Sequence, residues 1–351
     1  MSSSFVVSLS PHVRTKDSVS SVMWTVVIAM VPAILAGLWA FGISAALVLG
    51  LSTAACVLSE WFITVVMLKK PNRLADGSAV VTGLLLGMNL PAGTPLWQVL
   101  SGAVFAIGVG KMVFGGLGHN PFNPALVGRA FMLTSFPADM TAWPAPNLFR
   151  WNLLQFGGAS RYTATLGADA VSGPTALGLV AEGAAHTEGL SAIQGLPGHL
   201  DLFLGTIPGS MGEISALAIL VGGVFLLAKK IISWESPIFF LAGLSVFTGL
   251  FWILDPSRYA DPLYHILAGG AMLGAWFMVT DMVTSPMTPR GRMIFAGSAG
   301  LLTGAIRLFG AFPEGASYAI LIMNSFVPII DRYIRPTRFG SKQADLSRKG
   351  R

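Results

Sequence analysis

The sequence predicts an all-α polytopic membrane protein with about ten transmembrane helices, arranged as two inverted halves of five helices each. Of the 351 residues, 53% are hydrophobic and only 11% are charged, whereas soluble domains carry about 25% charged residues. The apolar residues also form runs close to the roughly 20 residues that a helix needs to cross a bilayer. Short loops rich in Lys and Arg separate these runs, which is typical of membrane proteins.

The candidate spans lie on either side of one long polar loop. In chain order they are 22–40, 43–68, 77–92, 97–114 and 123–136, then 213–228, 237–254, 263–280, 293–310 and 317–330. Several are short, and short or Gly/Pro-broken spans occur where they line a cavity or a bound group. We therefore divide the chain into a first half (1–136), a polar loop (137–212) and a second half with a basic tail (213–351).

An odd number of spans in each half means that related halves would have inverted topology. The sequence offers one weak sign of such a repeat. The fifth span of each half combines Asn with Pro, as Asn123-Pro124 and as Asn324 with Pro328. Chance recurrence in a Gly- and Pro-rich chain is the alternative explanation.

The basic residues predict the orientation, because cytoplasmic loops are enriched in Lys and Arg. Both termini are expected in the cytoplasm, and the loop 137–212 is expected on the outer, periplasmic side. This orientation places most of the 22 basic residues inside, namely Arg14, Lys16, Lys69, Lys70, Arg73, Lys111, Lys229, Lys230, Arg290, Arg292, Arg332, Arg335, Arg338, Lys342, Arg348, Lys349 and Arg351.

Several classes of function are excluded by composition. The net charge of +6 comes from short interhelical loops and a tail rather than from a basic face, so nucleic acid is not an expected partner. The single Cys56 rules out an internal disulfide framework and a Cys-ligated iron–sulfur cluster held by this chain alone. Cys56 lies in an apolar segment and is expected to be a buried structural thiol. No dinucleotide-binding glycine fingerprint or P-loop is present.

The most informative motif lies in the polar loop, at Asp169-Ala-Val-Ser172-Gly173-Pro174-Thr175. Glycine gives the backbone freedom to turn and leaves space around a neighbouring side chain. The segment can therefore present the Thr175 hydroxyl on a tight turn that an enzyme could approach. An ordinary structural turn is the alternative.

A second block, 115–131, joins the fourth and fifth spans on the expected cytoplasmic side. Two Asn-Pro corners predict broken backbone, which must be buried in protein or around a ligand at membrane depth. The amides of Asn120 and Asn123 can pair with the N–H and C=O edge of a ring. Capping of half-helix ends by both asparagines is the alternative.

Three ionisable residues lie in or beside spans, where charge is costly and often functional. Glu60 and Arg129 could pair with each other, with a bound cofactor or with a transported ion. Asp76 precedes the third span, where it would serve as a helix N-cap or contact a cation or cofactor. We treat these three residues as candidates for an ion pathway.

These segments, together with 322–333 near the C-terminus, resemble the RnfD family of the Rnf ion-translocating oxidoreductases over essentially the whole chain. That family and its relative in the sodium-pumping NADH:quinone reductase share the signature Asp-x-x-Ser-Gly-Ala-Thr. The resemblance implies FMN esterified to Thr175, with Asp169, Ser172 and Gly173 completing the signature. Pro174 departs from the usual Ala, and proline could either pre-form the turn or hinder modification.

The resemblance also implies a non-covalent riboflavin beside Asn120 and Asn123 and a fold like that of urea and ammonium channels. At the outer start of the sixth span, residues 209–213 would offer free backbone N–H groups to the FMN phosphate. Ser210 and Gly212 are therefore further candidates for cofactor binding. A simple N-cap by Ser210 is the alternative.

The function that this family implies is electron relay across the bacterial inner membrane, coupled to movement of Na⁺ or H⁺. The expected partners are the other Rnf subunits, among them a periplasmic FMN subunit and cytoplasmic subunits that handle NADH or ferredoxin. A flavin transferase would attach the FMN, and lipid would surround the helices. The rival interpretation is a channel or secondary transporter for a small solute, since the same architecture serves permeation. A purely structural anchor is disfavoured by the intramembrane Glu60 and Arg129.

Overall fold

The computed structural model describes residues 18–71, 74–144, 146, 175–186, 189–193, 195–205, 207–310 and 314–336. The helices of the first half are α1 (Val19–Phe41), α2 (Ile43–Trp61), α3 (Ser78–Met88), α4 (Leu96–Gly108) and α5 (Pro124–Ser135). The helices of the second half are α10 (Ala216–Ala228), α11 (Glu235–Leu254), α12 (Pro262–Leu267), α13 (Ala271–Leu273), α14 (Pro289–Phe309) and α15 (Ala316–Tyr333). Between the halves lie α6 (Pro137–Met140), α8 (Ala176–Ala185) and α9 (His199–Leu204).

The helical membrane fold that the sequence predicts is confirmed. Within the described ranges, five helices are long and apolar enough to cross a membrane, namely Val19–Phe41, Ile43–Met67, Leu96–Phe114, Glu235–Leu254 and Pro289–Phe309. The other predicted spans contain shorter helices or, in the case of α15, a helix that includes Pro328.

The predicted eighth span, 263–280, is wrong as one continuous helix. The chain leaves α12 at Ala268 and turns at Gly269, whose φ of 64° lies in the region that favours glycine. It then forms the short α13 and a π-helical turn at Gly274–Met278. Breaks of this kind are tolerated in a membrane protein only where neighbouring protein satisfies the freed backbone groups.

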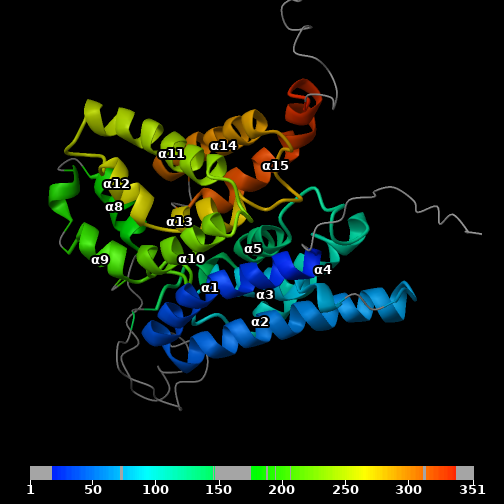
Figure 1. Cartoon of the computed structure of the whole chain (residues 1–351). Helices are drawn as coiled ribbons and strands as arrows, with labels where there is room; N and C mark the ends of the chain where they lie inside the picture. The colour runs from blue at the N-terminus through cyan, green and yellow to red at the C-terminus, as the bar shows by residue number, and fades with distance from the viewer. Residues whose placement is uncertain are drawn as a thin grey trace, which may run out of the picture.

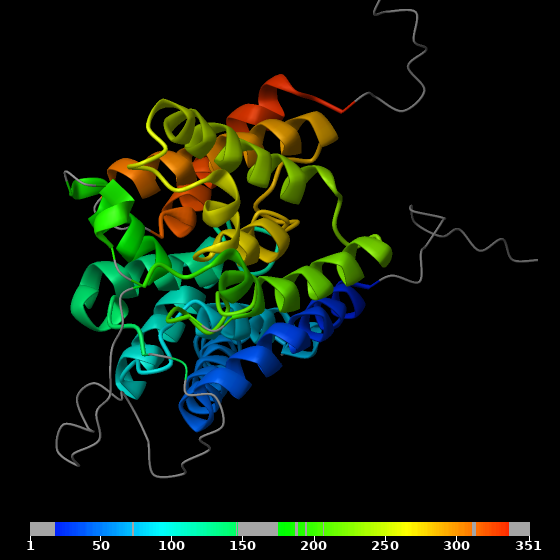
Figure 2. The same cartoon turned by 90° about the vertical axis from the view of Figure 1, so that its left-hand side faces the viewer.

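Within each half the helices pack on one another in the same order. The first half occupies the lower part of Figure 1 and the second half the upper part, and the turned view in Figure 2 shows the same division. In the first half α2 packs on α3 and α4, and α4 packs on α5; in the second half α11 packs on α12 and α14, and α14 packs on α15. Across the interface, α1 packs on α10 and α5 packs on α15. This is the packing that related halves would share, and their inverted relation stays a prediction.

The bundle has two distinct ends. Helices α8, α9 and α12 lie at one end, on the left of Figure 1, which we call the α8 end. The start of α1 and the end of α15 lie toward the opposite end, which we call the cavity end for the reason given below.

Close helix contacts depend on glycine. A Cβ atom added at Gly222 of α10 would lie 2.0 Å from the carbonyl oxygen of Ala29 on α1, and one added at Gly300 of α14 would lie 2.0 Å from that of Phe240 on α11. Only a residue without a side chain allows such approaches, as is typical of helix packing in membranes. The outer faces of the helices carry large exposed apolar side chains such as Leu58, Val246 and Ile253, which suits contact with lipid.

Candidate functional site

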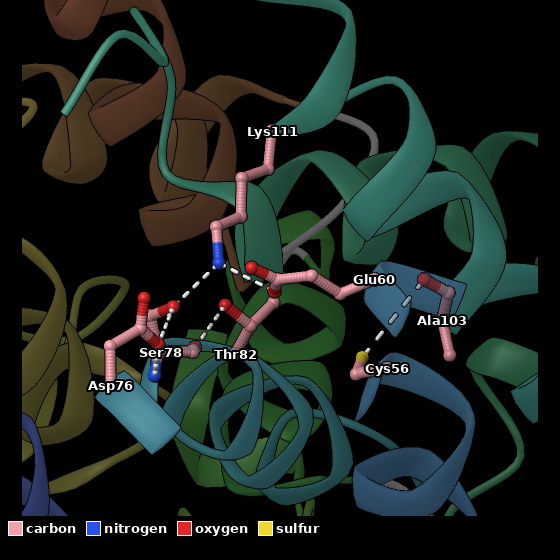
Figure 3. A network of polar contacts seen from close by, with 7 residues as sticks. All are labelled: Cys56, Glu60, Asp76, Ser78, Thr82, Ala103 and Lys111. Atoms are coloured by element: carbon pink, nitrogen blue, oxygen red, sulfur yellow. Dashed lines mark hydrogen bonds and ion pairs between the residues drawn. The ribbon is translucent and has the colours of Figure 1, made fainter. Parts of the chain in front are cut away.

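A buried polar cluster lies at the cavity end, where α2, α3 and the α4–α5 connection meet (Figure 3). Lys111 Nζ lies 2.6 Å from Oε2 of Glu60 and 2.6 Å from Oγ of Ser78. Asp76 Oδ1 accepts the backbone N–H of Ser78 at 2.8 Å and its hydroxyl at 2.7 Å. Thr82 completes the set by donating to the Ser78 carbonyl at 3.0 Å. We call these five residues the Lys111 cluster.

The Lys111 cluster gathers charged residues that the sequence singles out. The charge rule counts Lys111 among the basic residues on the cytoplasmic side, and its side chain is only 1% exposed. Glu60 pairs with Lys111 and not with Arg129, because a buried carboxylate requires a cation within hydrogen-bond reach. Asp76 acts as expected for a helix start, since it accepts the Ser78 N–H at the beginning of α3.

Cys56 lies nearby on α2 and is fully buried, with Sγ 3.9 Å from the carbonyl oxygen of Ala103 (Figure 3). The expectation of a buried structural thiol is confirmed.

A cavity opens beside the Lys111 cluster and lies between the two halves. It contains about 760 Å³ of empty space, part of it open to the outside. Its wall is mostly apolar, with side chains from α1, α3, α10 and the π-helical turn. The polar residues in its wall are Ser78, Thr82, Lys111, Asn120, Asn123, Thr280 and Asp281. Mostly apolar walls with a few convergent polar groups are typical of a cofactor pocket.

Asn120 and Asn123 both line this cavity, but their side chains make different hydrogen bonds. Asn123 is the N-cap of α5, because its Oδ1 accepts the N–H groups of Ala125 at 3.0 Å and Leu126 at 3.4 Å. Asn120 is not a helix cap; its Nδ2 donates to the carbonyl of Phe122 at 3.0 Å. Its Oδ1 is buried and has no hydrogen-bond partner among the described residues. The alternative of two helix caps is therefore correct for Asn123 and wrong for Asn120.

The second half contributes to the cavity end through Asn324 and Asp281. With its amide oriented to satisfy its neighbours, Asn324 accepts the backbone N–H of Asn123 and donates to the carbonyls of Thr284 and Ile320. The two asparagines that hint at a repeat thus meet at the α5–α15 contact. Asp281 follows the π-helical turn and accepts from Val283 and Thr284, and burial raises the pKa of its carboxyl.

Two buried arginines bind the carbonyl end of the third helix of each half. Arg129 on α5 donates to the carbonyl of Asn89, just after α3, and to the carboxylate of Glu314. Arg307 on α14 donates to the carbonyls of His265 and Ala268 at the end of α12. A cation at the C-terminus of a helix satisfies carbonyls that the helix itself leaves unpaired. Arg129 also lies 5.6 Å from the ring centre of Trp143, within cation–π range.

The segment 209–213 does not have the free backbone N–H groups that its composition predicts. Helix α10 begins only at Ala216, with Ser215 as its N-cap, so the prediction of Ser210 as a cap is wrong. Gly212 N–H donates to the carbonyl of Met88 at 2.7 Å, and Ser210 N–H lies 3.4 Å from Oε2 of Glu213. The loop is inserted against the end of α3, where the N–H of Gly212 is used within the protein.

Thr175 is the N-cap of α8. Its Oγ1 accepts the N–H of Gly178 at 3.0 Å, and the residue is 9% exposed. The next turn of α8 buries Leu177, which lies beside Gly269 in the break after α12. The remaining residues of the motif, Asp169, Ser172, Gly173 and Pro174, lie outside the described residues. Thr175 thus belongs to the α8 end of the bundle, whereas Asn120 and Asn123 belong to the cavity end.

Some residues of both sites are missed by sequence reasoning. The burial of Lys111 has one accompanying feature in the sequence, the neighbouring Gly110, where a Cβ atom would lie 3.0 Å from Cα of Pro124 at the start of α5. Glu314 and Arg307 give no local signal, because their partners lie in distant segments of the chain.

Comparison with known proteins identifies the family of this chain. Residues 6–340 match the family described as NQR2, RnfD, RnfE. The chain is 41% identical over 344 residues to the subunit designated D in the proton-translocating ferredoxin:NAD(+) oxidoreductase complex of Clostridium ljungdahlii, covering 97% of each chain. It is 40% identical over 336 residues to the Na(+)-translocating counterpart of Acetobacterium woodii, covering 95% of each chain.

A third relative has the same designation in the ion-translocating oxidoreductase complex of Shigella dysenteriae. It is 37% identical over 355 residues, and the match covers 97% of this chain and 99% of the relative. All three relatives align over nearly their full length. The chain belongs to the NQR2, RnfD, RnfE family.

Proposed function

We propose that this chain is the flavin-carrying membrane subunit of an Rnf-type ion-translocating oxidoreductase in the bacterial cytoplasmic membrane. Three relatives of nearly equal length are named as the corresponding subunit of ion-translocating oxidoreductase complexes. The helices have the length and the exposed apolar faces that a membrane subunit requires. The chain then works with other Rnf subunits, including a periplasmic FMN subunit and cytoplasmic subunits that handle NADH or ferredoxin.

The first flavin is FMN, esterified through its phosphate to Thr175 by a flavin transferase. Support comes from the position of Thr175 at the N-cap of a ten-residue helix. The N-terminus of a helix favours a phosphate through its unpaired N–H groups and its dipole. A phosphoester on Oγ1 would therefore lie where α8 stabilises negative charge.

The second flavin is a non-covalent riboflavin in the cavity at the opposite end. The unpaired Oδ1 of Asn120 is a buried acceptor that an N–H of the ring edge would satisfy. Lys111, whose ammonium has a third N–H beyond its bonds to Glu60 and Ser78, supplies a donor on the neighbouring wall. The apolar side chains of α1 and α10 would cover the ring faces. A bound flavin supplies the electron-transfer chemistry, while the protein positions it and sets its surroundings.

The separation of these two sites is the observation that carries the proposal. Thr175 lies at the α8 end and the cavity lies at the other end, so two carriers would divide a path of roughly 30 Å through the hydrocarbon core. With both termini in the cytoplasm, the α8 end faces the periplasm. Glu60 and Asp76 of the Lys111 cluster, together with Arg129, are then candidate charged groups along a path for Na⁺ or H⁺.

A denaturing gel viewed under ultraviolet light tests the proposal. The band of the wild-type chain should fluoresce because the ester survives denaturation. Thr175→Ala should abolish the fluorescence. The control Thr141→Ala, at the threonine that directly follows α6, should not. A dark wild-type band from a host that expresses the transferase would contradict covalent FMN.

A channel or secondary transporter is the second candidate. The cavity between the halves and the broken α12–α13 element favour it, because permeation pathways are lined by such backbone. The same gel separates the two functions, since a channel carries no covalent flavin.

A further inference from the structure

The loop 209–213 is fixed at the interface between the two halves. A Cβ atom added at Gly212 would lie 2.8 Å from Cδ2 of Leu273 on α13 and 3.0 Å from the carbonyl oxygen of Met88 on α3. The Gly212 N–H donates to that same Met88 carbonyl. Because α3 has 11 residues at about 1.5 Å each, its far end lies roughly halfway through the hydrocarbon core. The loop therefore carries the next residue, Glu213, deep into the protein.

The carboxylate of Glu213 is buried without a cationic partner. The residue is 7% exposed, and among the described residues it forms no ion pair. Its Oε2 lies 3.4 Å from the N–H of Ser210, and Oε1 faces Gly270 in the break before α13. A Cβ atom at Gly270 would lie 3.0 Å from that oxygen, so the missing side chain leaves the carboxyl its space.

The charged groups around Glu213 oppose one another. Arg129 on α5 and Arg307 on α14 attract a negative charge there, whereas Glu314, before α15, repels it. Both guanidinium groups already donate to backbone carbonyls, and Arg129 also binds Glu314. Burial opposes ionisation, and the two arginines favour it. A carboxyl in this balance can both hold and release a proton.

A metal cation fits this position less well than a proton does. Hard cations take about six oxygen ligands, whereas the carboxylate contacts the N–H of Ser210 and the backbone at Gly270. In the adjacent break the carbonyl of Ala268 already accepts from Arg307, and that of Gly270 accepts from Gly274. The hydroxyl of Ser210 is buried and unpaired in the part of the chain that the structure describes. This hydroxyl lies in the same loop as Glu213, where it could form a hydrogen bond with the carboxyl or with a water that carries a proton.

We propose that Glu213 is a proton-exchanging carboxyl inside the membrane pathway of this subunit. The role deepens the proposed function and rests on it, because it assigns the translocated proton a binding site between the halves. The exchange is a simple protonation of the carboxylate, with no other reactant.

Infrared difference spectroscopy of the full chain in proteoliposomes tests this proposal. The wild type should show a carbonyl band of a protonated carboxylic acid that disappears as the pH rises. Glu213→Gln should lack this band while keeping the isosteric contact to Ser210. Glu213→Asp should keep a titrating band at a shifted frequency. Glu235→Gln, in a buried glutamate at the start of α11, is the matched control and should keep the wild-type band.

Two results would overturn the proposal. One is a titrating band that survives in Glu213→Gln unchanged. The other is a wild-type band that Na⁺, but not K⁺, removes at constant pH, since Glu213 would then be a sodium ligand. If Glu213→Gln does not fold, Glu213→Asp still tests the proposal. A titrating band at a shifted frequency supports it, and a band at the wild-type frequency contradicts it.

The flavin readout separates this inference from the proposed function. A dark gel band with a titrating Glu213 would remove the electron-relay function and leave the proton site standing. In the assembled complex, Glu213→Gln should keep its covalent flavin and lose proton translocation. Unchanged proton translocation by the variant would count against the proposal.

Discussion

Lys111 Nζ lies 2.6 Å from Glu60 Oε2, and both side chains are withdrawn from the surface. The two residues stand 51 positions apart, on the α4–α5 connection and at the end of α2. Breaking such a buried pair by removing one partner leaves the other charge uncompensated, at a cost of about 3–5 kcal/mol. This pair therefore joins two helices of the first half beside the cavity.

Removal of Lys111 should destabilise the protein more than removal of the whole pair. Lys111→Met leaves the Glu60 carboxylate buried and alone, and should lower the free energy of unfolding by about 3–5 kcal/mol. The double variant Lys111→Met with Glu60→Leu should recover most of this loss. Thermal unfolding in detergent measures both, with Lys229→Met on an exposed turn as the control. Equal losses in the single and double variants would mean that Lys111 acts through something other than its charge.

The two asparagines of the cavity should be separable by mutation. Asn120→Leu removes the unpaired acceptor and should lower non-covalent riboflavin about fivefold or more, because a lost hydrogen bond to a buried group costs about 1–3 kcal/mol. Asn123→Ala removes the N-cap of α5 and should cost about 1 kcal/mol of stability. Acid extraction of the purified complex measures the free flavin, and thermal unfolding measures the stability.

The covalent FMN should not change in either variant, because an ester does not depend on a binding equilibrium. If Asn120→Leu retained stoichiometric riboflavin in a normally assembled complex, the cavity would not be the second flavin site.

The orientation can be read by labelling single cysteines in a Cys56→Ala background. Ser257→Cys, in the exposed turn after α11, should react with a membrane-impermeant maleimide added from the periplasm. Lys229→Cys, in the exposed turn after α10, should react only in inverted vesicles. The reverse pattern would invert the topology and place Thr175 in the cytoplasm.

The sequence predicts the long helices well because the length of an apolar run can be read from the local sequence alone. It also locates one break in the helices, since Asn123-Pro124 marks the start of α5. Long-range contacts cannot be predicted in this way. The charge rule counts Lys111 only as a basic residue near the cytoplasmic end of the span 97–114, and nothing near Lys111 in the sequence points to Glu60.

The prediction for the loop 209–213 is wrong for the same reason. Its glycines and serine have the composition of a helix start with free N–H groups. The N–H of Gly212 instead donates to the Met88 carbonyl in the first half of the chain, and that of Ser210 lies against the carboxylate of Glu213. Glu314 becomes visible as the partner of Arg129 only in the fold.

Mass spectrometry of peptides from the purified protein shows whether Thr175 carries FMN. We expect one FMN mass on the peptide that contains Thr175, with fragment ions that place it on that residue, and no such mass in Thr175→Ala. FMN on Thr163 or Thr165 of the same loop, or its absence from every peptide of a chain matured with its transferase, would mean that Thr175 is not the attachment site.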